Sequence, residues 1–374
     1  MVDLVAPVSE HAETRRGGPS PGIGLAISGG GYRAMLFHLG AFLRLFELGL
    51  LQQLTRISSV SGGSITSAKV ALEWGRLTSR DDFFEHVVAP IRRLASSTID
   101  WPCVAAGILL PGDVAHYISF AYRRFLFGDA MLSDLPASPE FVINATNMET
   151  GTLWRITRAS MADWKVGTIN KPRLFLSDAV AASSAFPPVL SPYVLKVKPS
   201  DFSGGRVHPA LRSNISLADG GVYDNLGLET VWKAFENVLV SDAGAALDPD
   251  PSPSADWLSQ SRRSIDVIYS QVGSLRKRQL IASYKAKKGQ PGARKGTYWG
   301  IGSDVAHYKL PSALPAPHDR TLPLAQISTR LKRLPPEVQE RLINWGYAIC
   351  DTALRRHFRQ PDEPTAQFPY EVGV

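Results

Sequence analysis

Apolar residues along this chain follow two spacings, one typical of buried strands and the other typical of helices. Short apolar runs predict strands at about residues 23–28, 56–60, 141–146, 153–157, 217 and 238–241. Longer segments with helical spacing predict helices at about 33–48, 64–75, 178–185, 226–235, 255–286 and 336–358, and prolines interrupt a further helical region at 81–127. Strands and helices that alternate in this way predict an α/β fold whose mostly parallel sheet is covered on both faces. The helix at 33–48 is apolar on nearly every side, so we expect it under the sheet or between layers.

Composition divides the chain into three regions. Residues 1–21 are polar and rich in proline and glycine, and we expect a mobile leader. The alternating strands and helices occupy residues 22–245, which we expect to form the main domain. After a proline-rich linker, residues 246–374 should form a mainly helical extension packed on that domain, with a basic loop around 276–298.

Bulk properties narrow the class of protein. The 374 residues are 44% apolar and 20% charged, as in ordinary globular proteins, and Cys103 and Cys350 cannot form a disulfide framework. We therefore expect a reducing, cytoplasmic environment, and neither a signal peptide nor a membrane-spanning segment is predicted. The net charge of +7 favours anionic partners, either lipid headgroups or nucleic acid. Without zinc-ligand spacing or an aromatic-basic RNA motif, nucleic acid is not expected.

Three short segments fall where predicted strands end, and together they indicate a hydrolytic site. Gly29-Gly30-Gly31 follows the first strand, Ser61 follows the strand at 56–60, and Asp219 follows the strand around 217. An α/β sheet places its ligand site at the carboxyl ends of its strands. A glycine loop can donate backbone N–H groups, a serine can attack a carbonyl, and an aspartate can accept the serine proton. The combination suggests acyl transfer to water.

Ser61 has the surroundings of a nucleophile elbow. Ser59 stands two residues before it and Gly63 two residues after it, and small residues are needed there because the strand-to-helix turn is tight. The usual pattern has glycine where this chain has Ser59. The alternative is a Ser/Gly loop in which Ser61 only caps the following helix.

The glycine loop also has two interpretations. Gly29 to Ala34 fits the dinucleotide-binding pattern G-x-G-x-x-A, but Glu47, the acid at nearly the required spacing, falls within the predicted helix. We favour a loop of N–H donors at a helix N-terminus, where the helix dipole also stabilises negative charge. Arg33 could hold a phosphate or brace the loop, and the alternative is a surface arginine.

Asp219 is the preferred base. Asp242 also follows a strand and is the main alternative, while Asp224 and Asp178 are further carboxylates in the region. No histidine after Asp219 stands at a predicted strand end, so we expect a dyad of serine and aspartate instead of a triad. His38 lies inside the apolar helix and should be a hydrogen-bonded core histidine.

These motifs resemble those of the patatin-like phospholipase family over about residues 22–245. The glycine loop, the serine elbow and Asp219-Gly220-Gly221 stand in the family's order, and Ala182 to Pro188 resembles a further family segment. Ser28 to Met35 is closer to the cytosolic phospholipase A2 branch than to the plant storage proteins, and residues 344–347 resemble bacterial members. The resemblance implies a three-layer αβα sandwich with a mostly parallel central sheet, a Ser–Asp dyad, acyl-ester lipid substrates, and no metal or other cofactor in catalysis.

The sequence thus predicts a lipid acyl hydrolase in which Ser61 attacks the ester, Asp219 takes its proton, and the N–H groups of Gly29-Gly30-Gly31 hold the oxyanion. The alternatives are an acyltransferase with the same dyad, or a catalytically degenerate lipid-binding or interaction protein. The expected partners are a phospholipid or other acyl-ester lipid and an anionic membrane surface, contacted peripherally. The basic segment 276–295 is the predicted membrane contact, and residues 101–110 are the alternative. The oligomeric state is open.

Overall fold

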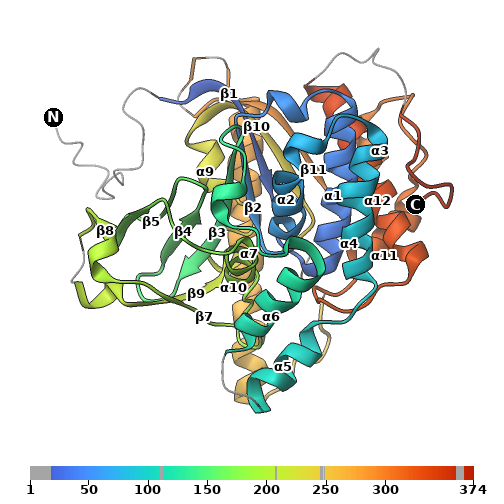
Figure 1. Cartoon of the computed structure of the whole chain (residues 1–374). Helices are drawn as coiled ribbons and strands as arrows, with labels where there is room; N and C mark the ends of the chain where they lie inside the picture. The colour runs from blue at the N-terminus through green and yellow to red at the C-terminus, as the bar shows by residue number, and fades with distance from the viewer. Residues whose placement is uncertain are drawn as a thin grey trace.

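A central sheet with helices on both faces forms the body of the molecule (Figure 1). The computed structural model describes residues 18–109, 113–206, 209–244, 247, 249–287, 289–290, 292–358 and 366–374. Its strands are β1 (Ser20–Ile27), β2 (Arg56–Val60), β3 (Glu140–Asn147), β4 (Thr152–Ile156), β5 (Ser160–Asp163), β6 (Gly167–Asn170), β7 (Tyr193–Lys196), β8 (Phe202–Ser203), β9 (Asn214–Asp219), β10 (Phe235–Asp242) and β11 (Lys295–Gly300). Its helices are α1 (Gly31–Glu47), α2 (Gly62–Leu72), α3 (Arg80–Phe83), α4 (Ala89–Ala95), α5 (Asp100–Leu109), α6 (Val114–Tyr122), α7 (Leu176–Ser183), α8 (Gly221–Asp224), α9 (Glu229–Trp232), α10 (Trp257–Lys285), α11 (His318–Ala325) and α12 (Pro336–His357).

The middle of the sheet is parallel. Strands β11, β10, β1, β2 and β3 lie side by side in that order and all run the same way. Beyond β3 the strands pair antiparallel: β4, β5, β6 and β8 extend one side of the sheet, and β7 pairs with β9. The predicted α/β class, with a mostly parallel sheet between helical layers, is confirmed.

The all-round apolar helix predicted near the N-terminus lies between two layers, as expected. Helix α1 packs between the sheet and α12, so residues on every side of it are buried. The two helices approach closely at a pair of glycines, because a Cβ on Gly40 would overlap the carbonyl oxygen of Ile343 and one on Gly346 would overlap that of Phe37. A buried ion pair of 2.7 Å between Arg44 and Asp351 joins the same two helices.

The C-terminal region differs from the expected helical extension with a basic loop. Strand β11 adds to the sheet in parallel beside β10, so this region completes the sheet as well as covering it. The segment predicted as a loop at 276–298 is helical as far as Lys285 and is a strand from Lys295. Lys288 lies outside the described residues, as does most of the predicted leader, residues 1–17. Strand β1 begins at Ser20, inside the range predicted for the leader.

Two strands meet end to end on one side of β3, and this arrangement creates the candidate site. Strand β2 pairs in parallel with the first part of β3, and its last residue, Val60, lies opposite Asn144. Strand β9 pairs antiparallel with the rest of β3, so that Asp219 lies opposite Ala145, while β4 occupies the other side. Ser61, the residue after Val60, is therefore brought next to Asp219. The sequence predicted both residues at strand ends, but their meeting depends on β9 running against β2.

Among the described residues, no helix combines the length and the apolar character that crossing a bilayer requires.

Candidate active site

Ser61 lies in a strained turn between a strand and a helix. Strand β2 ends at Val60 and α2 begins at Gly62, and Ser61 between them has a φ of 51° and a ψ of −122°. A non-glycine residue rarely adopts a positive φ, and such strain is concentrated at functional sites. The two following glycines are required by close packing, because a Cβ on Gly62 would overlap the carbonyl oxygen of Gly31, and one on Gly63 would lie 2.5 Å from that of Ser28.

The alternative interpretation of Ser61 as a capping serine finds no support in the structure. Ser61 is the N-cap residue of α2, yet its side chain makes no capping hydrogen bond. Its hydroxyl instead lies close enough to the carboxyl group of Asp219 to lower the pKa of that group. The side chain of Ser61 is thus directed towards the candidate base, as a nucleophile must be.

The serine that replaces the usual glycine of the elbow is accommodated by other hydroxyl groups. Ser59 is fully buried; its hydroxyl donates to the carbonyl of Val142 at 3.3 Å and accepts from Ser64 at 3.1 Å. The Ser64 hydroxyl also lies 2.9 Å from the hydroxyl of Ser183. These contacts satisfy a polar group that would otherwise be costly to bury under the turn.

The carboxyl end of α7 supports both members of the pair. The N–H of Ser61 donates to the hydroxyl of Ser183 at 3.0 Å, and that hydroxyl donates to the carbonyl of Asn144 at 2.6 Å. The N–H of Asp219 donates to the carbonyl of Ala185 at 2.8 Å. No motif of the sequence assigns a role to Ser183, although the segment from Ala182 to Pro188 resembles a family segment. That similarity was the signal that could have pointed to it.

Asp219 is a buried carboxyl group with a raised pKa. Burial raises its pKa to about 6, and hydrogen bonds from the Ser61 hydroxyl and from the N–H of Gly221, at 2.7 Å, limit the rise. A carboxylate whose pKa lies close to the working pH is suited to accept a proton and later return it. Position and acidity therefore both fit Asp219 as a general base.

The glycine loop provides fewer donors than predicted. The N–H of Gly29 donates to the carbonyl of Asn225 at 3.1 Å, so it is already used within the protein. In the part of the chain that the structure describes, the N–H groups of Gly30 and Gly31 have no such acceptor. These two groups lie at the N-terminus of α1, next to the elbow. Of the three N–H donors predicted for the oxyanion loop, those of Gly30 and Gly31 therefore remain as candidates. The sequence did not predict that the carbonyl of Asn225 accepts the third.

Arg33, in the first turn of α1, ties that helix to the segments that follow β10 and α11. Its guanidinium donates to the carbonyls of Ala243 and Ile327 and to the hydroxyl of Thr329, and burial lowers its pKa to about 10. The residue is 1% exposed, so it is not the surface arginine of the alternative interpretation. Most of its N–H groups are committed to these oxygens, which leaves little capacity to hold a phosphate.

The alternative carboxylates have structural partners. Asp242 accepts from Tyr298 at 2.7 Å and pairs with Lys277 at 2.6 Å. Burial raises the pKa of Asp242, but Lys277 and the hydrogen bonds from Tyr298 and the N–H of Gly244 together lower it below its ordinary value. Asp242 ends β10, two strands away from β2, or about 10 Å in the sheet. Asp224 accepts from the backbone N–H groups of Leu226 and Glu229, and Asp178 accepts from the hydroxyl of Ser119.

His38 is the hydrogen-bonded core histidine that the sequence predicted. Its ring nitrogens contact the hydroxyl of Ser241 at 2.8 Å and the carbonyl of Ser28 at 3.0 Å, and burial lowers its pKa to about 3. An imidazole that stays neutral in the core and is occupied at both nitrogens does not complete a triad.

Two parts of the C-terminal region cover the site: the segment around Arg330, and helix α10. The backbone of Arg330 lies against Gly31 and accepts the N–H of Tyr32 at 3.0 Å. Tyr269 of α10 lies against Gly221, and burial and the nearby carboxyl group of Asp219 raise the pKa of its phenol. With these neighbours in place, Ser61 is only 7% exposed.

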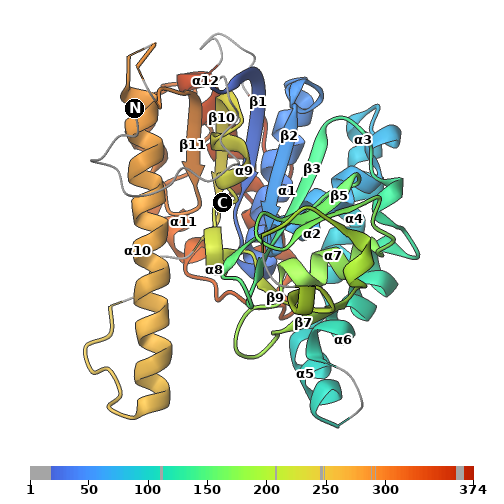
Figure 2. The ribbon, with the colours of Figure 1, turned by 90° about the vertical axis from the view of Figure 1, so that its left-hand side faces the viewer.

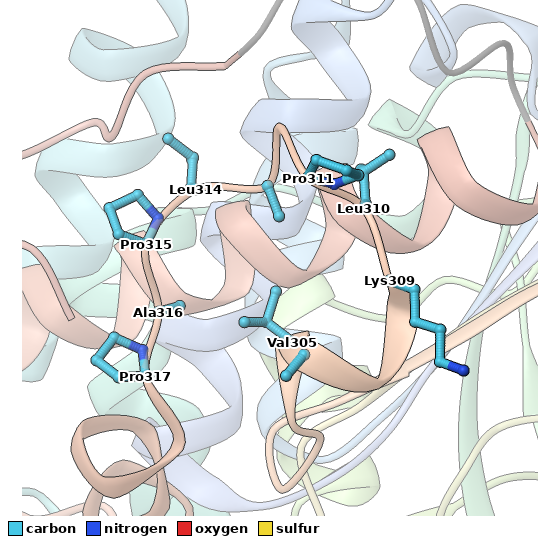
Figure 3. Close-up of a pocket in the computed structure, with 10 residues that line it drawn as sticks. Val305, Lys309, Leu310, Pro311, Leu314, Pro315, Ala316 and Pro317 are labelled. Atoms are coloured by element: carbon cyan, nitrogen blue, oxygen red, sulfur yellow. The ribbon is translucent and has the colours of Figure 1, made fainter.

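A hollow of about 630 Å³ lies elsewhere on the molecule (Figure 3). It is lined by apolar and proline residues between Val305 and Pro317, with Lys309 as the charged residue among them. None of the glycine loop, Ser61 or Asp219 lines it, so it is separate from the candidate active site. Among the described residues, no three histidine, cysteine, aspartate or glutamate side chains converge as metal ligands would.

Comparison with known proteins gives the family to which this chain belongs. The chain belongs to the patatin-like phospholipase family, whose model matches residues 25–232, more than half of the chain. Uncharacterised NTE family proteins of Mycobacterium bovis and Mycobacterium tuberculosis are 25% identical to it over 260 residues, which is 68% of this chain and 59% of each relative. The chain therefore spans about three fifths of the length of these curated relatives.

The fold is similar to that of human GIVD cytosolic phospholipase A2. The TM-score is 0.52 at 15% identity, over 89% of this chain and 61% of the human one. The same human protein in complex with methyl gamma-linolenyl fluorophosphonate gives a TM-score of 0.51, over 89% and 57% of the two chains. At this identity the likeness shows a shared fold, and it agrees with the family assignment.

Proposed function

We propose that this protein is a lipid acyl hydrolase that cleaves carboxylic ester bonds of phospholipids or related acyl lipids through Ser61 and Asp219. The observation that carries the proposal is the strained Ser61 held beside the buried carboxyl group of Asp219, whose pKa is raised to about 6. Membership of the patatin-like phospholipase family supports the class of substrate.

In this mechanism the Ser61 oxygen attacks the ester carbonyl as Asp219 accepts its proton. The N–H groups of Gly30 and Gly31, at the start of α1, stabilise the oxyanion, and the dipole of the 17-residue helix adds to their effect. Collapse of the intermediate expels the alcohol, which takes the proton from Asp219, and leaves an acyl-enzyme on Ser61. Asp219 then accepts a proton from water, the resulting hydroxide equivalent attacks the acyl-enzyme, and the fatty acid leaves as Ser61 is reprotonated.

The cellular setting is part of the proposal. Both cysteines, Cys103 and Cys350, are buried thiols, and burial raises the pKa of each, as suits a reducing cytoplasm. We place the protein there, working peripherally on the lipid surface that carries its substrate.

The test is labelling of the full chain with a fluorophosphonate, followed by mass spectrometry of defined phospholipids incubated with wild type and Ser61→Ala. The expected result is one label on Ser61, fatty-acid release by wild type, and neither in the variant. Circular dichroism shows whether the variant is folded. A folded Ser61→Ala protein that still releases fatty acid would refute Ser61 as the nucleophile, and an unlabelled wild type without activity would favour a degenerate lipid-binding protein.

A further inference from the structure

Two helices project from the same end of the molecule, on either side of the candidate site. Figures 1 and 2 show α5 and the amino-terminal part of α10 reaching beyond the end of the sheet at which β1, β2 and β10 finish. Ser61 follows the end of β2 at this same edge. Any surface that approaches the two helices therefore also approaches the candidate active site.

The projecting parts of both helices expose large apolar side chains. Seven of these, which we call the apolar end, are each between 62% and 79% exposed: Trp101, Ile108 and Leu109 of α5, and Trp257, Leu258, Ile265 and Ile268 of α10. Isolated exposed apolar residues are ordinary, but a group gathered at one end marks an interaction surface. Tryptophan and aliphatic residues together are typical of segments that enter the boundary between water and lipid.

The apolar end is connected to the site through individual residues. Arg330, whose backbone lies against the glycine loop, forms a 2.8 Å ion pair with Asp100 and stacks on the ring of Trp101 at the start of α5. On the other side, Tyr269 of α10 packs edge-on against Phe186, which follows α7. The two exposed helices are thus anchored to the loop and to the segment that hold the catalytic pair.

The charge of α10 decides what covers this surface. Leu258, Ile265, Ile268, Val272 and Leu275 are exposed at the alternating spacing of three and four residues that is found in coiled coils, so a second copy of the chain is one possible partner. However, the projecting part of α10 carries two basic residues, Arg262 and Arg263, and a single acidic one, Asp266. The exposed Arg262 lies four residues after Leu258 and three before Ile265, directly beside the apolar stripe. Two such helices would place like charges against each other, whereas an anionic lipid surface would complement them.

The structure also argues against the basic segment that the sequence suggested as the membrane contact. The lysines at the end of α10 and the start of β11 lie at the opposite edge of the sheet, because Lys295 pairs with Asn237 near the start of β10. Helix α10 has 29 residues, so about 43 Å separates its projecting amino-terminal end from its carboxyl end, far more than the ~8 Å over which charges act at physiological salt. A membrane bound at that edge would face away from Ser61. Part of the segment is also committed within the protein, since Arg276 pairs with Glu229.

We infer that the apolar end is a docking surface for anionic lipid membranes, in which α5 and the amino-terminal part of α10 enter the headgroup boundary and hold the mouth of the site against the bilayer. The purpose of docking, which is to bring lipid substrate to Ser61, rests on the proposed function. The binding of the membrane itself does not. The alternative segment that the sequence suggested, residues 101–110, therefore supplies one half of the surface, although Leu110 lies outside the described residues.

The test is flotation of the full chain with vesicles of ether-linked phosphatidylglycerol and phosphatidylcholine, which have no acyl ester to cleave. The docking variant combines four substitutions, Ile108→Ser, Leu109→Ser, Ile265→Ser and Ile268→Ser. Because it buries less apolar surface in lipid, its partition coefficient onto the vesicles should be lower than that of wild type by a factor of ~10 or more. The matched control is Val267→Ser with Ile281→Ser, exposed apolar residues on other faces of α10, and its vesicle binding should match that of wild type.

A second control, Lys285→Gln with Lys287→Gln, removes charge at the opposite edge and should also bind vesicles as wild type does. Equal binding by the docking variant, or loss confined to either control, would overturn the inference. So would a wild type that is dimeric by light scattering and a docking variant that is monomeric, because a second copy would then be the occupant.

Hydrolysis of a soluble short-chain ester separates this inference from the proposed function. The docking variant should retain the wild-type rate on that ester, since none of its substitutions touches Ser61 or Asp219. If wild type binds vesicles through the apolar end but never cleaves the ester, the proposed function fails and the docking surface stands. If wild type cleaves the ester and the docking variant still binds vesicles normally, the docking surface fails and the proposed function stands.

Discussion

Replacing Asp219 by asparagine should abolish hydrolysis and, at neutral pH, stabilise the fold. The pKa of this carboxyl group rises from its ordinary 3.8 to about 6 because it is buried. Each pKa unit is equivalent to about 1.36 kcal/mol, so keeping Asp219 ionised in the folded protein costs about 3 kcal/mol of folding free energy. Between pH 3.8 and 6 the folded state holds this proton and the unfolded state does not, so wild type loses stability as pH rises through that range. The neutral amide of the Asp219→Asn variant does not titrate, so the variant escapes this loss.

The free energy of unfolding of wild type and Asp219→Asn is measured by urea denaturation at about pH 4.5 and about pH 7.5, on either side of the raised pKa. The stability of the variant relative to wild type should increase by about 2 kcal/mol between the two pH values, since part of the effect is already present at the lower one. The titration of all other groups changes the free energy of unfolding of wild type and variant equally, so it cancels in this comparison. In parallel, wild-type turnover of a soluble ester should rise with pH through about 6 and then level off, as the base becomes ionised. A stability difference that is the same at both pH values would refute the assignment of a raised pKa to Asp219.

Three further expectations follow from contacts at the site. Ser183→Ala should lower kcat about tenfold with little change in KM, because the N–H of Ser61 loses its acceptor. Ser184→Ala is the control and should change kcat much less, because Ser184 does not contact the elbow. Equal effects of the two substitutions would argue against positioning by Ser183. Gly62→Ala should destabilise the fold by about 1–3 kcal/mol in denaturation experiments, because its Cβ overlaps Gly31, while Gly75→Ala, with open space around it, should not. EDTA should leave hydrolysis of a soluble ester unchanged, and inhibition reversed by one particular metal ion would contradict a serine–aspartate mechanism.

Much of the fold could be predicted from the sequence because the information is local. The spacing of apolar residues predicted β1, β2, β3 and β10 of the parallel centre and the helices α1, α2, α10 and α12 close to where they lie. The short antiparallel strands β5 to β8 and the edge strand β11 were missed, because their sequences carry little apolar alternation and they are specified by pairing with neighbours. Pairing between distant segments is not encoded in any local window.

The candidate site divides in the same way. The sequence by itself determined which residue types stand at which strand ends, and so pointed to Ser61, Asp219 and the glycine loop. Only the tertiary structure decided that β9 runs against β2 and brings Ser61 and Asp219 together, that Asn225 takes the N–H of Gly29, and that Arg33 is enclosed by carbonyl groups. It also decided that the lysines at the end of α10 and the start of β11 lie at the edge away from the site. Motifs are properties of neighbouring residues, whereas hydrogen-bond partners, burial and the pKa values that depend on them arise from segments far apart in the chain.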